Sequence, residues 1–168
     1  MPLSRIRWAP FRIAFRDPFH TAADADTRVT APRYREGILL EIRDGDGIVG
    51  YGEASPLPER GEGTTRDVAE LLGSMPTGLP QLDATTLLKT CETCIAKPGG
   101  RALACAMETA LLDLRGRSEA MPIAALLAES GTTTPIVPVN ATIGDPDIAS
   151  AASAAPPNPK PQTLTPKP

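Results

Sequence analysis

The N-terminal third of the chain alternates apolar and polar side chains with the two-residue period that is typical of half-buried β-strands. Three stretches carry this pattern and predict strands, at residues 3–15, 36–43 and 48–54. An Asp-Gly-Asp-Gly sequence at 44–47 joins the last two strands and predicts an antiparallel hairpin, because Asp and Gly tolerate positive φ. Pro10 places the first strand at a sheet edge or beside a bulge.

Beyond the strands, the apolar positions recur at the 3.6-residue spacing of amphipathic helices. Thr64 or Thr65 is suited to cap a first helix, and Asp83 a second. Residues 101–117 give the clearest helical pattern, and a short helix is expected after Pro122. This order of elements predicts an α+β fold in which a three-stranded antiparallel meander is followed by helices.

Small residues predict where the sheet and the longest helix come close. Gly50 and Gly52 lie two residues apart and therefore on one face of their strand. The helix at 101–117 carries a stripe of small side chains on one side. We expect another element to pack directly against the backbone of the strand at these glycines.

Composition narrows the class of protein. The 168 residues are 41% hydrophobic and 22% charged, which is typical of a soluble globular domain. A net charge of −3 argues against a general nucleic-acid binder, which needs a basic surface. There is no apolar run of about 20 residues and no apolar segment near the N-terminus, so neither a membrane span nor a signal peptide is expected. We therefore expect a cytoplasmic protein.

The cysteines do not predict a metal or disulfide site. Cys91 and Cys94 form a Cys-x-x-Cys pair, and Cys105 is the third cysteine of the chain. A zinc site takes about four Cys or His ligands, and His20 is the one histidine in the sequence. We interpret Cys91 and Cys94 as small apolar residues on a helix.

Several segments together resemble a known family. The segment Gly-Tyr-Gly-Glu-Ala-Ser-Pro-Leu-Pro at 50–58 resembles the capping domain of the enolase superfamily. Residues 105–117 and 121–127 resemble the helix pair of the mandelate racemase and muconate-lactonizing branch. The run Val-Pro-Val-Asn-Ala at 137–141 resembles the first strand of that branch's (β/α) barrel. The combination is most similar to the o-succinylbenzoate synthase family.

The resemblance implies a domain organisation. Residues 1–134 are expected to form an enolase-like N-terminal capping domain, and 135–153 the start of a truncated (β/α) barrel. Residues 154–168 are expected to be a disordered proline-rich tail, because their prolines end the helix that would begin near Asp145. A shifted reading frame and a true linker that docks a partner are the two explanations for this tail.

The resemblance also implies a chemistry. In the family a lysine removes the proton α to a carboxylate, and Mg²⁺ stabilises the enediolate that results. In the synthase this leads to loss of water, a step of menaquinone biosynthesis. The metal ligands and the lysine pair lie beyond the first barrel strand, so we expect no catalytic residue and no bound Mg²⁺ in this chain. The expected ligand of the parent enzyme is a small carboxylate.

Two capping loops select the substrate in the family, and they correspond here to residues 16–30 and 50–57. The resemblance makes five residues candidate substrate contacts. The first loop supplies Phe19, His20 and Thr21, and the second Ser55 and Pro56.

Other roles remain open for several polar and aromatic residues. Phe19 is alternatively a core residue and His20 a solvated one. Glu53 is expected to bond backbone groups, and Asp113 to make a buried polar contact rather than to act as an acid or base.

Three interpretations of the whole chain remain open. The first is an inactive N-terminal part of an o-succinylbenzoate synthase. The second is the same part of a dipeptide epimerase or a muconate cycloisomerase. The third is a non-enzymatic cap that binds a partner or, through an exposed apolar face, another copy of itself.

Overall fold

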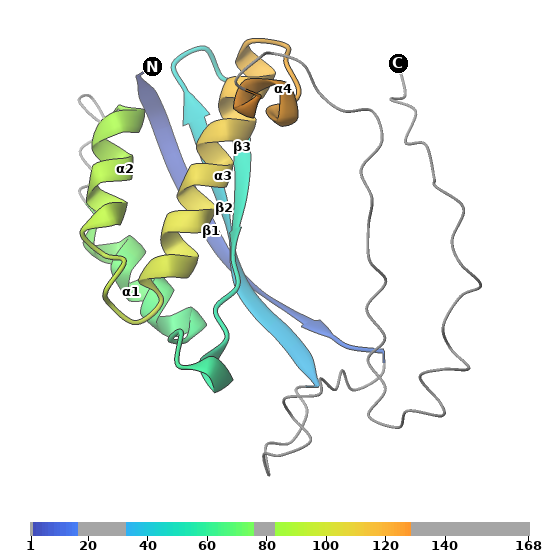
Figure 1. Ribbon diagram of the computed structural model, residues 1–168, viewed down its shortest axis with the longest axis vertical. Helices are drawn as coiled ribbons and strands as arrows, with labels where there is room; N and C mark the ends of the chain where they lie inside the picture. The colour runs from blue at the N-terminus through green and yellow to red at the C-terminus, as the bar shows by residue number, and fades with distance from the viewer. Residues whose placement is uncertain (1, 17–32, 76–82, 129–168) are drawn as a thin grey trace. The chain divides into compact units, whose positions relative to one another are not determined.

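A three-stranded antiparallel sheet in the order β1-β2-β3 forms one layer of the fold (Figure 1). Its strands are β1 (Leu3–Ala14), β2 (Tyr34–Asp44) and β3 (Val49–Ala54). The computed structural model describes residues 2–16, 33–75 and 83–128. The α+β meander that the sequence predicts is confirmed.

The register of β2 against β3 separates a buried face from an exposed one. Ile38, Leu40 and Ile42 oppose Ala54, Gly52 and Gly50 respectively, and these three β2 side chains are at most 1% exposed. Leu39 and Tyr51, on the other face, are 48% and 43% exposed. Because successive side chains of a strand point to opposite faces, one face of the sheet belongs to the core and the other lies open.

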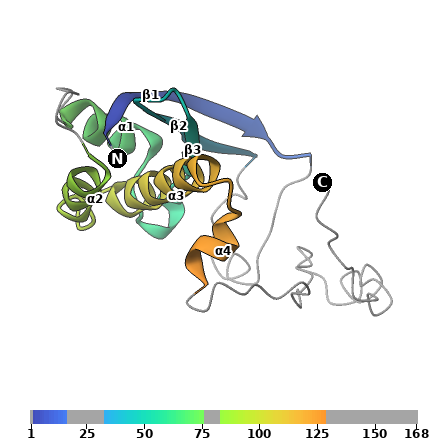
Figure 2. The same cartoon turned by 90° about the horizontal axis from the view of Figure 1, so that it is seen from above.

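Helices lie on the buried side of the sheet, except for the last and shortest one, which packs on the longest helix (Figure 2). They are α1 (Thr65–Ser74), α2 (Ala84–Glu92), α3 (Gly100–Ser118) and the short α4 (Ile123–Leu127), and a 3-10 turn, η2, spans Pro58–Arg60. No helix within the described ranges is long and apolar enough to cross a membrane.

The helix starts follow the sequence prediction. Thr64 caps α1 in a capping box: its hydroxyl accepts the amide of Asp67, whose carboxylate accepts the amide of Thr64. The carboxylate of Asp83 accepts the amide of Thr86 and so caps α2. Each cap satisfies amides that the first turn of a helix leaves without a partner.

Helix α3 lies directly on β3 because two glycines leave room for it. A Cβ at Gly52 would lie 1.9 Å from the carbonyl oxygen of Ala106, and one at Gly50 would lie 2.1 Å from that of Ala110. No side chain fits in that space, so the predicted close approach at Gly50 and Gly52 is confirmed. The strand and the helix meet backbone to backbone.

The core lies between the sheet and the helices. Its largest fully buried side chains come from both layers: Ile38, Leu40, Ile42, Val68, Leu87, Cys91, Leu103, Met107 and Leu114. Every buried side-chain nitrogen or oxygen in the described part of the chain has a hydrogen-bond partner.

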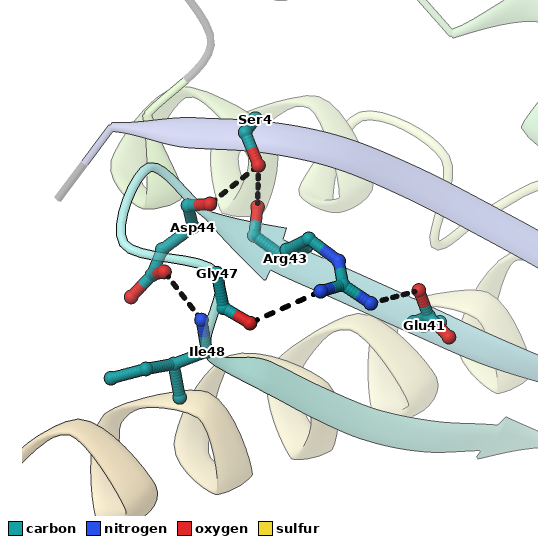
Figure 3. A network of polar contacts seen from close by, with 6 residues as sticks. All are labelled: Ser4, Glu41, Arg43, Asp44, Gly47 and Ile48. Carbon is teal, nitrogen blue, oxygen red and sulfur yellow. Dashed lines mark hydrogen bonds and ion pairs between the residues drawn. The ribbon is translucent and has the colours of Figure 1, made fainter.

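The β2–β3 hairpin is closed by polar contacts at its turn (Figure 3). The buried carboxylate of Asp44 accepts the amides of Asp46 and Ile48 at 3.0 and 2.9 Å. The hydroxyl of Ser4, on β1, donates to the carbonyls of Arg43 and Asp44. These bonds join all three strands at the end of the sheet where the predicted Asp-Gly turn lies.

Two details differ from the sequence prediction. The alternating apolar residues of β1 are more exposed than a half-buried strand requires, since Trp8 is 42% and Ile13 61% exposed. The helical spacing of Leu87, Leu88, Cys91 and Ile95 predicts that α2 reaches Ile95, but the helix ends at Glu92. Ile95 lies in the turn that follows and is 42% exposed.

The chain divides into two compact units, Met1–Ile13 with Arg35–Gly131, and Ala14–Tyr34 with Thr132–Pro168. In the second unit the structure describes residues 14–16 and 33–34, where the amide of Phe15 donates to the carbonyl of Arg33 at 2.9 Å. The predicted barrel strand and proline-rich tail lie outside the described residues, as do Phe19, His20 and Thr21.

Candidate functional site

The loop that follows β3 carries two of the predicted substrate contacts, Ser55 and Pro56. Pro56 is buried and Ser55 is half-buried, so the loop lies against the protein where it leaves the strand. The guanidinium of Arg35 donates to the carbonyl of Ser55 in a partly buried contact. The hydroxyl of Ser55 donates to Glu53 Oε1 at 2.6 Å. Both the backbone and the side chain of Ser55 therefore have a charged partner.

Hydrogen bonds between Leu57 and Glu62 close the part of the loop that leads toward α1. The amide of Leu57 donates to Glu62 Oε2 at 3.2 Å, and the amide of Glu62 donates to the carbonyl of Leu57 at 3.3 Å. The carbonyl of Glu62 accepts the amide of Gly99, just before α3, at 2.9 Å. The loop between Leu57 and Glu62 is thus a small closed ring attached to the helical layer.

Gly37 provides the space in which Ser55 and an aromatic ring sit. A Cβ at this position would lie 2.5 Å from the Ser55 Oγ and 2.6 Å from the Phe11 Cζ. Both distances are shorter than carbon and oxygen atoms tolerate, so a larger residue at 37 would displace either side chain. Phe11, Gly37 and Ser55 bring β1, β2 and the loop together at one end of the sheet.

The charges around this end of the sheet are paired among themselves. Arg12 and Glu36 form an ion pair at 2.6 Å with 62% and 40% of their side chains exposed. An ion pair with this exposure contributes little to stability because solvent screens it. Glu53 is exposed and bonds the Ser55 hydroxyl, which corrects the expectation that it would bond backbone groups.

The described residues do not provide a metal site. Within residues 2–16, 33–75 and 83–128, no three His, Cys, Asp or Glu side chains are grouped so that they could hold an ion. The carboxylates Glu53, Glu62 and Asp113 each bond protein donors instead. A Mg²⁺ site requires several oxygens around one point, and this part of the chain does not provide such a group.

The cysteine pair belongs to the core, but only Cys91 is on a helix as the sequence predicted, since Cys94 lies in the turn after α2. Cys91 and Cys94 are 2% and 6% exposed. Burial, with a smaller contribution from Cys94, raises the pKa of the Cys91 thiol to about 11. A thiol with this pKa stays protonated at neutral pH, and the thiolate is the form that reacts and binds metals.

Asp113 makes a polar structural contact, but its side chain is 22% exposed rather than buried as predicted. Its carboxylate accepts the amide of Tyr51 at 2.9 Å and the guanidinium of Arg117 at 3.0 Å. Arg117 also lies 5.8 Å from the centre of the Tyr51 ring. Because β3 is an edge strand of the sheet that the described residues form, Asp113 satisfies an amide that none of their strands pairs with.

A shallow groove lies between α2 and α3. Its volume is about 390 Å³, and Leu88, Leu111 and Leu112 line it together with Glu108, Arg115 and Glu119. The groove is apolar, and its charged residues are on the rim of α3. Glu108 is one of the charged residues that line this groove.

Sequence reasoning missed three residues that contact or border this loop, namely Arg35 and Gly37 on β2 and Glu62 at the loop's end. The register that places Ile38 opposite Ala54 also brings Arg35 and Gly37 close to Ser55. A register predicted from the Asp-Gly turn gives this proximity. It does not give the bond from Glu62 to Leu57, because that bond depends on the loop conformation.

Comparison with known families gives one match. The family model described as "Mandelate racemase / muconate lactonizing enzyme, N-terminal domain" matches residues 8–128. No curated protein matches the sequence.

Solved structures share the fold at low identity. A dipeptide epimerase from Methylococcus capsulatus, complexed with Mg and the dipeptide L-Arg-D-Lys, is 22% identical with a TM-score of 0.66, over 91% of this chain and 41% of that one. A dipeptide epimerase from Cytophaga hutchinsonii, complexed with Mg and D-Ala-L-Val, is 17% identical with a TM-score of 0.71, over 91% and 40%. The L-Ala-D/L-Glu epimerase from Bacillus subtilis is 19% identical with a TM-score of 0.61, over 76% and 34%. This chain spans less than half the length of each.

Proposed function

The chain belongs to the mandelate racemase and muconate lactonizing enzyme family, through its N-terminal domain, and we propose that it caps the active site of a dipeptide epimerase. The proposed reaction removes and returns the proton α to a carboxylate of the dipeptide. The cap closes over the substrate and helps to select it, while metal and base belong to a second, barrel-forming part of the enzyme. Mg²⁺ is the proposed cofactor of that second part.

The observation that carries this proposal is the extent of the structural likeness. Two epimerases with Mg and a dipeptide bound match 91% of this chain, at TM-scores of 0.66 and 0.71. The family match covers residues 8–128, which supports the proposal that 1–134 form the cap. We also propose that 135–153 begin a barrel and that 154–168 form a tail.

The conformation of the loop at 53–57 supports the proposed role of the cap. A residue that selects a substrate must be held in a defined position before the substrate arrives. Ser55 is held through both its carbonyl and its hydroxyl. We propose Ser55 and Pro56 as substrate contacts on this loop, and Phe19, His20 and Thr21 as contacts on the preceding one.

A second candidate is o-succinylbenzoate synthase, which the motifs at 50–58 and 105–127 favour. The two candidates share the first chemical event, loss of a proton α to a carboxylate, and differ in substrate and outcome. An epimerase returns the proton, whereas the synthase eliminates water. The substrate that loses its proton therefore distinguishes them.

The test combines the full chain with the barrel part of the Methylococcus capsulatus epimerase, Mg²⁺ and D₂O. We expect the α-proton signal of L-Ala-L-Glu or L-Arg-L-Lys to disappear from the ¹H NMR spectrum faster than with the barrel part alone. Dehydration of the synthase substrate without exchange in any dipeptide would favour the second candidate. A stable complex that acts on neither substrate class would contradict both.

A further inference from the structure

We propose that Arg35 and Glu53 are positioning residues that fix Ser55 so that its hydroxyl oxygen can only accept a hydrogen bond from a ligand. The loop would then favour a substrate group with a donor, such as an ammonium or an amide N–H, over a carboxylate. This inference rests on the proposed function, because it concerns which substrate the cap selects.

The backbone of Ser55 is fixed by Arg35. The guanidinium donates to the Ser55 carbonyl, and the contact is partly buried. A charged donor gives a stronger hydrogen bond than a neutral one. Arg35 lies on β2 near Gly37, so the contact ties the loop to the strand beside the one it leaves. Loss of this contact would free the loop without opening the core, because Ile38 and its neighbours pack on the opposite face.

The side chain of Ser55 is oriented by Glu53. The hydroxyl proton lies in the 2.6 Å bond to Glu53 Oε1, and a serine hydroxyl has one proton and two lone pairs. Toward a ligand, the Ser55 oxygen can therefore only accept a hydrogen bond. Gly37 lies beside the oxygen, because a Cβ at position 37 would lie 2.5 Å from it and 2.7 Å from the carbonyl oxygen of Ala54.

The Ser55 oxygen, as an acceptor beside the Glu53 carboxylate, discriminates between substrate groups that donate a hydrogen bond and groups that are negatively charged. The ammonium and the amide N–H of a dipeptide are donors and meet the Ser55 oxygen and Glu53 favourably. A carboxylate has no donor and is repelled by Glu53. Arg35, on β2 beside this loop, directs its guanidinium to the backbone carbonyl of Ser55. The geometry thus favours a dipeptide over a substrate that presents a carboxylate to this loop.

The first test measures amide hydrogen exchange in the full chain and in Arg35→Ala. We expect exchange of the Leu57 amide to accelerate by about tenfold, as when a charge-assisted hydrogen bond is lost at a partly exposed site. Exchange of the Ala110 amide in α3 should be unchanged. Arg35→Lys should recover part of the protection, and Arg66→Ala, which removes an exposed arginine of α1, should change neither amide. Equal acceleration at Leu57 and Ala110, or no change at Leu57, would overturn the positioning role.

The second test follows the amide resonances of Glu53 and Ser55 while the full chain is titrated with glycinamide, a cation with donors, or with acetate. At matched ionic strength we expect glycinamide to shift both resonances and acetate to shift neither. Ser55→Ala and Glu53→Gln should weaken the response by about tenfold. Glu59→Gln, which neutralises an exposed carboxylate in η2, should preserve it.

Equal responses to the two probes, no response to glycinamide, or a response that survives Ser55→Ala would overturn the acceptor assignment. Neither readout needs catalysis. A negative result in these tests is therefore distinct from failure of α-proton exchange, which would overturn the proposed function instead.

Discussion

The contact between β3 and α3 and the loop that follows β3 are held by different forces. In the first region Gly50 and Gly52 bring backbone against backbone, and buried apolar side chains surround the contact. In the second region single polar contacts from Arg35, Glu53 and Glu62 determine the conformation. Substitutions at the contact between β3 and α3 should therefore destabilise the fold. Substitutions in the loop should alter which groups it binds without unfolding the protein.

This difference suits a cap that must select a substrate. Close packing gives a rigid base, because interiors leave few voids and transmit strain. The loop at the end of that base carries polar side chains that can be exchanged at small cost to stability. Substrate selection and folding thus depend on largely separate residues, and substitutions in each region test that separation.

The largest effect is expected from Met107→Ala in α3. Met107 is 0% exposed, and its truncation removes apolar contacts and leaves a cavity in the core. We expect the free energy of unfolding to fall by about 2–5 kcal/mol, as for other truncations of this kind. Urea denaturation followed by circular dichroism measures it. A change below about 1 kcal/mol would mean that the core near α3 is not closely packed.

Gly52→Ala is expected to have the next largest effect. The added methyl group would lie 1.9 Å from the Ala106 carbonyl oxygen, so β3 and α3 must separate. We expect a loss of about 1–3 kcal/mol, the usual cost of overpacking. Gly73→Ala is the matched control, because Gly73 lies in α1 with open space around it. This control should stabilise the protein by about 0.5–1 kcal/mol.

Removal of the α1 cap should have a smaller, pH-dependent effect. Thr64→Ala should cost about 1 kcal/mol at neutral pH. The hydroxyl of Thr64 and then its amide lower the pKa of Asp67 below 3.8 in the folded protein. A lowered pKa stabilises the fold above about pH 4, and this contribution is lost as the pH falls through the folded-state pKa.

Thermal denaturation between neutral pH and pH about 3 tests the sign of this effect. The melting temperatures of the parent and Thr64→Ala should approach each other on acidification. A difference that grows as the pH falls would contradict the assigned role of Asp67.

Arg66→Ala should have the smallest effect of the four. Arg66 pairs with Glu70 along α1 at 2.9 Å, and their side chains are 86% and 62% exposed. Surface pairs four residues apart contribute about 0.3–0.5 kcal/mol. Urea denaturation in low and high salt should show a loss of this size that disappears in high salt. A salt-independent loss would point to a contact other than the ion pair.

Much of the fold followed from local signals in the sequence. The hairpin was predicted from the Asp-Gly turn, α1 from Thr64, α2 from Asp83 and the close contact of β3 and α3 from the paired glycines. These features depend on neighbouring residues and so leave a local pattern. The burial of β1 was predicted less well, because exposure of Trp8 and Ile13 depends on which face of the sheet the helices cover.

The candidate site was predictable in part. Ser55 and Pro56 came from the resemblance of the segment at 50–58 to a known family. The proximity of Arg35 to Ser55 follows from the strand register that the Asp-Gly turn predicts. The bond from the Leu57 amide to Glu62 depends on the conformation of a loop, which composition and periodicity do not encode. Phe19, His20 and Thr21 stay predictions, since they lie outside the described residues.

The most direct test of the contrast between the two regions is native-state hydrogen exchange of the full chain in increasing, sub-denaturing urea. The amides of Ala106 and Ala110 should exchange with the free energy and urea dependence of global unfolding, as expected for a cooperative core. The Leu57 amide should exchange at a lower free energy and with little urea dependence. Exchange of Leu57 together with the core, or local opening of α3 before the loop, would contradict the account.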